Sequence, residues 1–308
     1  MRAERPIRIG TRASALAMRQ AELVRQRLCE RFPNRTFALH PVTSPADRQP
    51  DAPLVTLGGE GVFVKELETA LLKEEIDLAV HSLKDLPLAS PQGLRIAAVL
   101  AREEARDALI ARASASVEAL PSGAQVGTSS LRRQSQLSAH RSDLRIAEIR
   151  GNVDTRLRKL DEGRYDAIVV AACGLQRLGL ANRITQLLDI SLMTPEPGQG
   201  ALAVEARTHD VTADELAAAL EDPVSRACVE AERAFLRALG GGCRVPIAAY
   251  AQVRDRMLWL RGAVLTPDGR QQLRGELTGP IDEPVALGER LATQLISSGA
   301  LDLLKMRP

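Results

Sequence analysis

Apolar residues alternate between two periods over the first two thirds of the chain. Residues 7–9 form a short β-rich run, and apolar positions at helical spacing follow over residues 16–28. A second helical pattern covers residues 63–72, and residues 77–81 and 95–100 indicate strands. Strands that alternate with amphipathic helices are typical of α/β domains. The pattern therefore predicts an α/β lobe at the start of the chain.

The same rhythm starts again in residues 106–194, with strands expected near residues 124–127, 145–149 and 166–171. Residues 101–105 lead into this second lobe. The return segment, residues 194–200, contains two prolines and two glycines, which do not allow a continuous helix or strand. Two crossings between two lobes predict a hinge with a cleft. After the return, residues 201–205 could rejoin the first lobe as a strand.

The last part of the chain has a different pattern. A helical stretch over residues 223–239 precedes three strand-like runs, 247–253, 257–265 and 271–278, and a helix over residues 283–297. This order predicts an α+β unit. The sequence therefore predicts three domains: residues 1–100 with 200–218, residues 106–194, and residues 222–308.

The net charge and composition of the chain do not change the predicted fold, but they argue against some functions. Among 308 residues, 41 Lys and Arg against 39 Asp and Glu leave a net charge of +2, which argues against a dedicated nucleic-acid binder. A content of 45% hydrophobic and 26% charged residues is typical of a folded protein. The N-terminal residues lack the apolar core of a signal peptide, and no apolar run is long enough for a membrane span. A cytoplasmic location is expected.

The four cysteines do not indicate a disulfide framework or a metal site, because they form no CxxC pair and have no histidine at zinc-ligand spacing. Cys29, Cys173 and Cys228 lie in or beside predicted helices and strands and are interpreted as structural. Cys243 follows three glycines, which allow a bulky group to come close. It is either a plain loop cysteine or a thiol for covalent attachment or nucleophilic attack.

Three predicted turns join a strand end to a helix start and combine small or hydroxyl residues with arginine. They are residues 10–14, residues 127–133, and residues 150–152 with Arg156. Backbone N–H groups and the helix dipole at such turns favour an anion, and ligands of open α/β sheets bind at the carboxyl ends of the strands. Helix capping by Ser and Thr beside solvated arginines is the alternative. Neither GxxxxGK[ST] nor GxGxxG occurs, so a multiply anionic ligand other than a nucleotide is expected.

The stretch from His81 to Pro87 places Lys84 and Asp85 side by side on a loop after a strand. The carboxylate of Asp85 could act as an acid, a base or a stabiliser of a cation. A surface ion pair is the alternative. His81 is interpreted as a satisfied residue at the strand end, and nothing supports a hydrolase triad.

Together these stretches resemble the porphobilinogen deaminase family. The matching motifs, from the start of the chain to its last domain, lie at residues 9–14, 63–68, 79–87, 126–134, 149–156, 174–179, 198–201 and 241–246. Eight motifs in the same order are far more specific than any one of them.

The resemblance implies an α/β fold of two periplasmic-binding-protein-like lobes with a hinged cleft, plus a C-terminal α+β domain. It implies a transferase that joins four porphobilinogen molecules into hydroxymethylbilane and releases four ammonia. The cofactor would be a dipyrromethane held by a thioether to Cys243. Each pyrrole carries an acetate and a propionate, so the growing chain is the polyanion that the arginine turns require. The family's partners are the small-molecule substrate alone, without nucleic acid or membrane, and the expected state is a monomer.

The resemblance also assigns roles to single residues. Asp85 would be the catalytic residue. Cofactor binding would fall to Cys243, Lys84, Ser82, Thr128, Ser129, Ser130, Arg132 and Arg133. Substrate binding would fall to Arg12, Ser14, Arg150, Asn152, Arg156, Arg177 and Gln199. No residue would bind a metal.

The chain departs from the family pattern between residues 43 and 61. Ala46 stands where the family usually has glycine, and Glu60 replaces a lysine in the Gly-Gly-Lys-Gly step of a loop over the cleft. These changes leave open the contact of this loop with the ligand, and an inactive relative remains a possible interpretation. A solute receptor or effector domain is a further alternative. The missing export signal, the lack of a DNA-binding helical segment at the start and the Gly-Gly-Cys loop argue against it.

Overall fold

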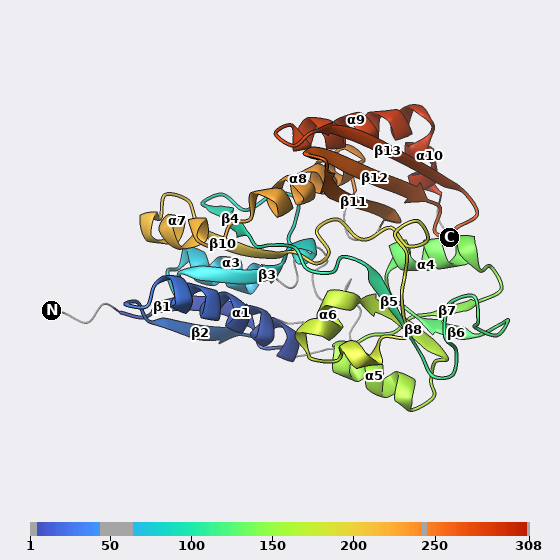
Figure 1. Ribbon diagram of the computed structural model, residues 1–308, viewed down its shortest axis with the longest axis horizontal. Coiled ribbons are helices and arrows are strands. Elements are labelled where there is room, and N and C mark those ends of the chain that lie inside the picture. The colour runs from blue at the N-terminus through green and yellow to red at the C-terminus, as the bar shows by residue number, and fades with distance from the viewer. Residues whose placement is uncertain (1–4, 44–63, 242–244, 307–308) are drawn as a thin grey trace. The chain divides into compact units, whose positions relative to one another are not determined.

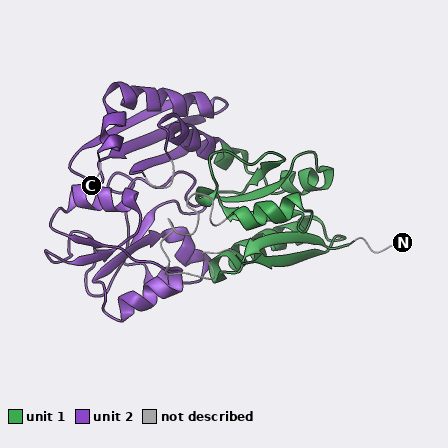
Figure 2. Cartoon of the chain, turned by 180° about the vertical axis from the view of Figure 1, so that it is seen from behind, with its two compact units in different colours: residues 1–102, 201–226 green, residues 103–200, 227–308 purple. Residues whose placement is uncertain are grey.

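The computed structural model describes residues 5–43, 64–241 and 245–306 (Figure 1). The chain divides into two compact units, one of residues 1–102 and 201–226 and one of residues 103–200 and 227–308 (Figure 2). Within the described residues, every helix is too short or too polar to cross a membrane.

The first unit contains a five-stranded sheet with the order β2-β1-β3-β10-β4. Its strands are β1 (Ile7–Arg12), β2 (Phe37–Val42), β3 (Leu78–Ser82), β4 (Leu94–Val99) and β10 (Leu202–Arg207). β1 is parallel to β2 and β3, whereas β10 is antiparallel to β3 and β4. The prediction that the chain returns to the first lobe as a strand is therefore confirmed.

Helices cover both faces of this sheet. They are α1 (Ala15–Arg31), α3 (Lys65–Leu72) and α7 (Val211–Ala218), with the short 3-10 helix η1 (Leu83–Asp85). Apolar residues of α1 and α7 pack on one face in a common core, and α3 packs on the other face around Ala79. β3 is buried on both faces, which agrees with the apolar residues 78–80 at its start.

The second unit begins with another five-stranded sheet, of order β7-β6-β8-β5-β9. The strands are β5 (Asp107–Ala111), β6 (Gln125–Gly127), β7 (Arg145–Ala147), β8 (Ala167–Ala171) and β9 (Gln186–Leu187). The helices are α4 (Leu131–His140), α5 (Val153–Asp161), α6 (Ala172–Arg177) and η2 (Ala181–Arg183). β6 is parallel to β7 and β8, and β5 is antiparallel to β8. Both sheets thus have three parallel strands followed by one antiparallel strand that comes directly after a crossing.

The C-terminal part of the second unit is the predicted α+β arrangement. Its antiparallel strands are β11 (Ile247–Arg254), β12 (Met257–Leu265) and β13 (Gln272–Pro280). The helices are α8 (Pro223–Ala238), α9 (Pro284–Ser297) and α10 (Ala300–Lys305). All three helices share one apolar core with the sheet, and α9 and α10 lie on the same face of it (Figure 1). The predicted fold class, α/β lobes with an α+β C-terminal domain, is confirmed.

Candidate active site

In the first unit, the predicted site residues gather at the carboxyl ends of β1 and β3. Ser14 caps α1 by accepting a hydrogen bond from the backbone N–H of Ala17 at 3.3 Å. Ser82 accepts a hydrogen bond from Nε2 of Gln20 at 2.9 Å. A pocket in this unit is lined by Arg12, Ser14, Leu16, Ala17, Gln20, Val64, Val80, His81, Ser82 and Asp85. The structure therefore brings Arg12, Ser14, Ser82 and Asp85 together.

The path of the loop that carries Asp85 is set by its neighbour Leu83. The Leu83 side chain is fully buried, and its backbone N–H donates to the carbonyl of Ala201 at 3.0 Å. The N–H of Leu86 closes the turn on the carbonyl of Leu83 at 3.1 Å. Lys84 and Asp85 remain half-buried. The burial of Leu83 thus positions Asp85, the candidate catalytic residue, at the pocket.

In the second unit, the hydroxyl side chains of the turn 127–133 form hydrogen bonds with the backbone near the start of α4. Ser130 caps α4 and accepts from the N–H of Arg133 at 3.4 Å. Thr128 Oγ1 accepts from the N–H of Ser130 at 3.2 Å, and the Ser129 hydroxyl donates to the carbonyl of Ile149 at 2.6 Å. The capping interpretation therefore holds for Ser130. It does not exclude ligand binding at the same helix start.

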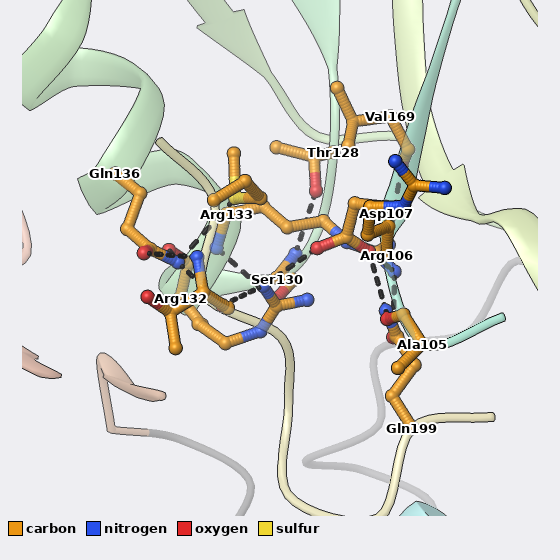
Figure 3. Close-up of polar contacts among 12 residues, drawn as sticks. Ala105, Arg106, Asp107, Thr128, Ser130, Arg132, Arg133, Gln136, Val169 and Gln199 are labelled. Carbon is orange, nitrogen blue, oxygen red and sulfur yellow. Dashed lines mark hydrogen bonds and ion pairs between the residues drawn. The ribbon is translucent and has the colours of Figure 1, made fainter. Parts of the chain in front are cut away.

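The buried carboxylate of Asp107 lies beside this turn, at the start of β5 (Figure 3). Arg132 Nη1 lies 2.8 Å from Oδ2, and Arg133 Nη2 lies 2.8 Å from Oδ1. Gln199 Nε2 donates to Oδ1 at 2.9 Å. Burial alone would raise the pKa of Asp107, but the two guanidinium charges and these hydrogen bonds hold it well below its ordinary value of 3.8. Asp107 is therefore an ionised partner of two predicted site residues.

Arg132 and Arg133 use their nitrogens differently. Arg133 donates from Nε to Asp107 Oδ1 at 3.0 Å and from Nη1 to the carbonyl of Val169 at 3.2 Å. Arg132 donates only from Nη1, to Asp107 and to the carbonyl of Thr194, both at 2.8 Å. Among the described residues, its buried Nε and Nη2 have no hydrogen-bond partner. Arg132 therefore keeps two nitrogens for a ligand, whereas each side-chain nitrogen of Arg133 already has a protein acceptor.

A second group of arginines follows β7. Arg156 donates from Nε to the carbonyl of Gly151 at 2.8 Å, and Arg150 pairs with Glu148. Burial, together with the charges of Arg133 and Arg150, lowers the pKa of Arg156 to about 10. Arg156 thus stays charged at neutral pH, and three guanidinium groups form one positive region. Asn152 is exposed at the N-cap position of α5.

Arg177 fastens the two crossing segments within the second unit. It lies 3.0 Å from Glu103 and donates to the carbonyl of Gly200 at 2.8 Å. Gly200 has a φ of +92°, and a Cβ there would lie 2.7 Å from the carbonyl oxygen of Glu103. Only glycine fits this approach without strain. The structure thus gives Arg177 an anchoring contact, and its binding of substrate stays a prediction.

The described cysteines are enclosed by the protein. Cys173 and Cys228 are buried and Cys29 is half-buried, and none forms a disulfide. Cys243, Ala46 and Glu60 lie outside the described residues. The role of Cys243 as the attachment point therefore stays a prediction. Within residues 5–43, 64–241 and 245–306, we find no group of side chains arranged to hold a metal ion.

The sequence interpretation did not identify the buried carboxylates of Asp107 and Glu205. Asp107 could have been noticed as a lone acid at the start of the apolar run Ala108–Ile110. Glu205 on β10 lies with Oε2 at 3.3 Å from Nε2 of His81, and both side chains are buried. The two atoms are close, but the contact does not have the geometry of a hydrogen bond. His81 is thus paired at the strand end but is not fully satisfied.

Replacement of Asp107 by asparagine should destabilise the protein strongly at neutral pH. The change leaves two buried guanidinium groups without their counter-charge, a loss of about 3–5 kcal/mol of unfolding free energy. A depressed carboxyl pKa contributes stability above the unfolded-state value of 3.8 that is lost as the pH falls. The wild-type free energy of unfolding should therefore decrease below about pH 4, and that of Asp107→Asn should decrease less. Urea unfolding at stepped pH measures both; parallel curves would contradict the assignment.

Arginines at the strand ends of two α/β lobes, together with the Asp85 loop, give the arrangement that is expected in a class of proteins that bind anionic ligands. Residues 7–215 match the family model "Porphobilinogen deaminase, dipyromethane cofactor binding domain", and residues 226–297 match "Porphobilinogen deaminase, C-terminal domain". The chain belongs to the porphobilinogen deaminase family. It is thus a transferase family member of tetrapyrrole biosynthesis with a dipyrromethane cofactor, and its product is hydroxymethylbilane.

Known proteins similar to the chain cover almost its whole length. The porphobilinogen deaminase of Acidithiobacillus ferrooxidans (strain ATCC 53993 / BNL-5-31) is 50% identical over 299 residues, 97% of either chain. That of Pelobacter propionicus is 48% identical over 301 residues, which cover 98% of this chain and 97% of the relative. Among solved structures, the methionine binding protein MetQ has 15% identity and a TM-score of 0.46, over 70% of this chain and 89% of that one. The near-complete coverage by family members extends the assignment to both units.

Proposed function

We propose that this chain joins porphobilinogen units on a primer attached to Cys243, with Asp85 as the catalytic carboxylate. The observation that carries the proposal is the placement of Asp85 on a fixed turn at the carboxyl end of β3, in one pocket with Arg12 and Ser14. Cationic and hydroxyl groups for substrate carboxylates thus lie beside a carboxylate that can face a developing positive charge.

The chemistry requires a negative charge at this place. Loss of ammonia from the substrate's aminomethyl group leaves an electron-poor pyrrole cation, which a fixed carboxylate stabilises better than mobile water does. When bound, the dipyrromethane supplies the free pyrrole carbon onto which the next ring is coupled. Asp85 then holds the proton that the coupled ring releases, and Arg12 and Ser14 orient the substrate carboxylates.

The second unit would hold the cofactor and the growing chain. The side-on edge of Arg132, Nε with Nη2, matches one carboxylate with two parallel hydrogen bonds. Arg150 and Arg156 suit further carboxylates, and the charge of Arg133 adds to the positive region around them. The remaining proposed contacts come from Ser82 and Lys84 in the first unit and from Thr128, Ser129, Ser130, Asn152, Arg177 and Gln199 in the second.

The sequence-based domain boundaries and the cellular setting belong to the same proposal. Three separate sheets support three domains, residues 1–100 with 200–218, residues 106–194 and residues 222–308. We expect a cytoplasmic monomer that binds a small-molecule substrate and no nucleic acid. Incubation of the purified chain with porphobilinogen, followed by assays for linear tetrapyrrole and ammonia, tests the proposed function; absence of both products would refute it.

Removal of the Arg150 side chain should weaken binding of the growing chain without unfolding the protein. Arg150 is half-buried and its only hydrogen-bonded or ionic side-chain partner among the described residues is Glu148. Loss of charge-assisted hydrogen bonds in Arg150→Leu should lower kcat/KM by about 10- to 100-fold. Steady-state kinetics measures the effect. Arg158→Leu, an exposed arginine on α5, is the control; equal kinetics in the two variants would contradict the assignment.

A further inference from the structure

The Asp107 carboxylate joins side chains from segments of the second unit that are far apart in the sequence. Oδ2 accepts from Arg132 of α4, whereas Oδ1 accepts from Arg133 and from Gln199 of the return segment. Gln199 also donates to the carbonyl of Ala105 at 2.7 Å, just before β5 (Figure 3). Asp107 thus holds the start of α4 and the return segment against β5.

The two arginines depend on this acid for their position. Arg132 and Arg133 are adjacent on α4 and only 3% and 5% exposed, and both place their charges at the same buried carboxylate. Burial and the positive charge of Arg133 both lower the pKa of Arg156, so a further positive charge acts on this group of side chains. Asp107 offsets the repulsion between these charges at a fixed place. Without it, the guanidinium groups would move apart or toward solvent.

The contacts also decide which edge of Arg132 is left for a ligand. Asp107 and the carbonyl of Thr194 both bind Nη1, which leaves the side-on edge of Nε and Nη2 without a partner among the described residues. This edge presents two parallel N–H groups, the geometry that binds a carboxylate in a bidentate manner. Arg133 turns its own side-on edge toward Asp107 Oδ1. Arg132 and Arg133 carry the same charge, but Arg132 leaves an edge for a ligand, whereas Arg133 uses its edge to bind Asp107.

We propose that Asp107 is a positioning residue that holds Arg132 through Nη1, so that its Nε and Nη2 edge receives a ligand carboxylate, with Arg133 as part of the supporting frame. The inference rests on the proposed function, because that function supplies the carboxylate-bearing ligand. It assigns a specific task to a residue that does not itself touch the ligand. It also separates two arginines that the sequence treats as equivalent.

The test compares three full-length variants. Asp107→Asn removes the charge, and Asp107→Glu keeps the charge but displaces it by one methylene. Asp77→Asn is the matched control, because Asp77 is a largely buried aspartate of the first unit that also pairs with an arginine. Its Oδ2 accepts hydrogen bonds from the backbone N–H of Arg8 at 2.8 Å and from Arg8 Nε at 3.1 Å. Burial raises the pKa of Asp77, but its contacts with Arg8 outweigh this effect and lower the pKa, as the arginines do for Asp107. Each protein is examined by intact-protein mass spectrometry for the fraction that carries the dipyrromethane adduct and by thermal unfolding for stability.

The expected result separates loading with cofactor from stability. Both Asn variants should lose stability, but Asp107→Asn should carry the adduct at a fraction at least about tenfold lower than Asp77→Asn does. Asp107→Glu should fold and yet remain loaded below the wild-type level. This variant decides the question if Asp107→Asn does not fold.

Equal loading of Asp107→Asn and Asp77→Asn would overturn the inference. Wild-type loading of Asp107→Glu would also overturn it, because charge balance alone would then suffice. Either result, with a loaded wild-type protein, leaves the proposed function in place. A wild-type chain that carries no adduct after exposure to porphobilinogen would instead refute the proposed function.

Discussion

Replacement of Asp85 by asparagine is expected to reduce turnover by about 10²- to 10³-fold. The change keeps the size of the side chain and removes the negative charge that stabilises the pyrrole cation. Because the turn around it is held by buried Leu83, the loop should keep its conformation. The adduct should remain detectable by intact-protein mass spectrometry, while a coupled assay for tetrapyrrole measures the loss of turnover.

The control for this variant is Asp154→Asn, an exposed aspartate in the first turn of α5. It removes the same charge at a place outside the proposed machinery, and its turnover should match that of the wild type. Substantial turnover by Asp85→Asn, at least a tenth of the wild-type rate, would remove Asp85 from its catalytic role.

Replacement of Cys243 by serine should abolish both the covalent adduct and tetrapyrrole formation. A hydroxyl is a far weaker nucleophile than a thiol at neutral pH, so the thioether cannot form. The protein should fold as before, because one exchanged atom changes little of the side-chain volume. The intact mass then equals that of the unmodified chain, and turnover falls below detection.

Cys29→Ser is the matched control. Cys29 is the most exposed of the three described cysteines, so it is the best competing site for attachment. Its replacement should leave both the adduct mass and turnover unchanged. An adduct that persists in Cys243→Ser and disappears in Cys29→Ser would move the attachment point and refute the assignment.

Local patterns in the sequence predict most of the fold, because the elements themselves are periodic. The turns at residues 10–14 and 127–133 were expected from small and hydroxyl residues beside arginine, and Ser14 and Ser130 do cap helices there. β2 was not predicted. Its exposed His40 and Pro41 break the apolar alternation, and an edge strand tolerates both residues.

The partnership of Asp107 with Arg132 could not be predicted in the same way. The two residues are 25 positions apart, and their contact depends on β5 entering the sheet antiparallel to β8. Composition shows many arginines but not which of them are buried. The sequence therefore treats Arg132 and Arg133 alike, whereas only Arg132 of the pair has buried nitrogens without a hydrogen-bond partner among the described residues.

We expect that a primer tethered to Cys243 is extended ring by ring. Intact-protein mass spectrometry of the wild-type chain during limited exposure to porphobilinogen tests it most directly, with digestion to locate the adduct. We expect a mass corresponding to two pyrrole rings on the peptide of Cys243, followed by stepwise additions of one ring at a time. An unmodified Cys243 peptide in protein that produces tetrapyrrole would contradict it.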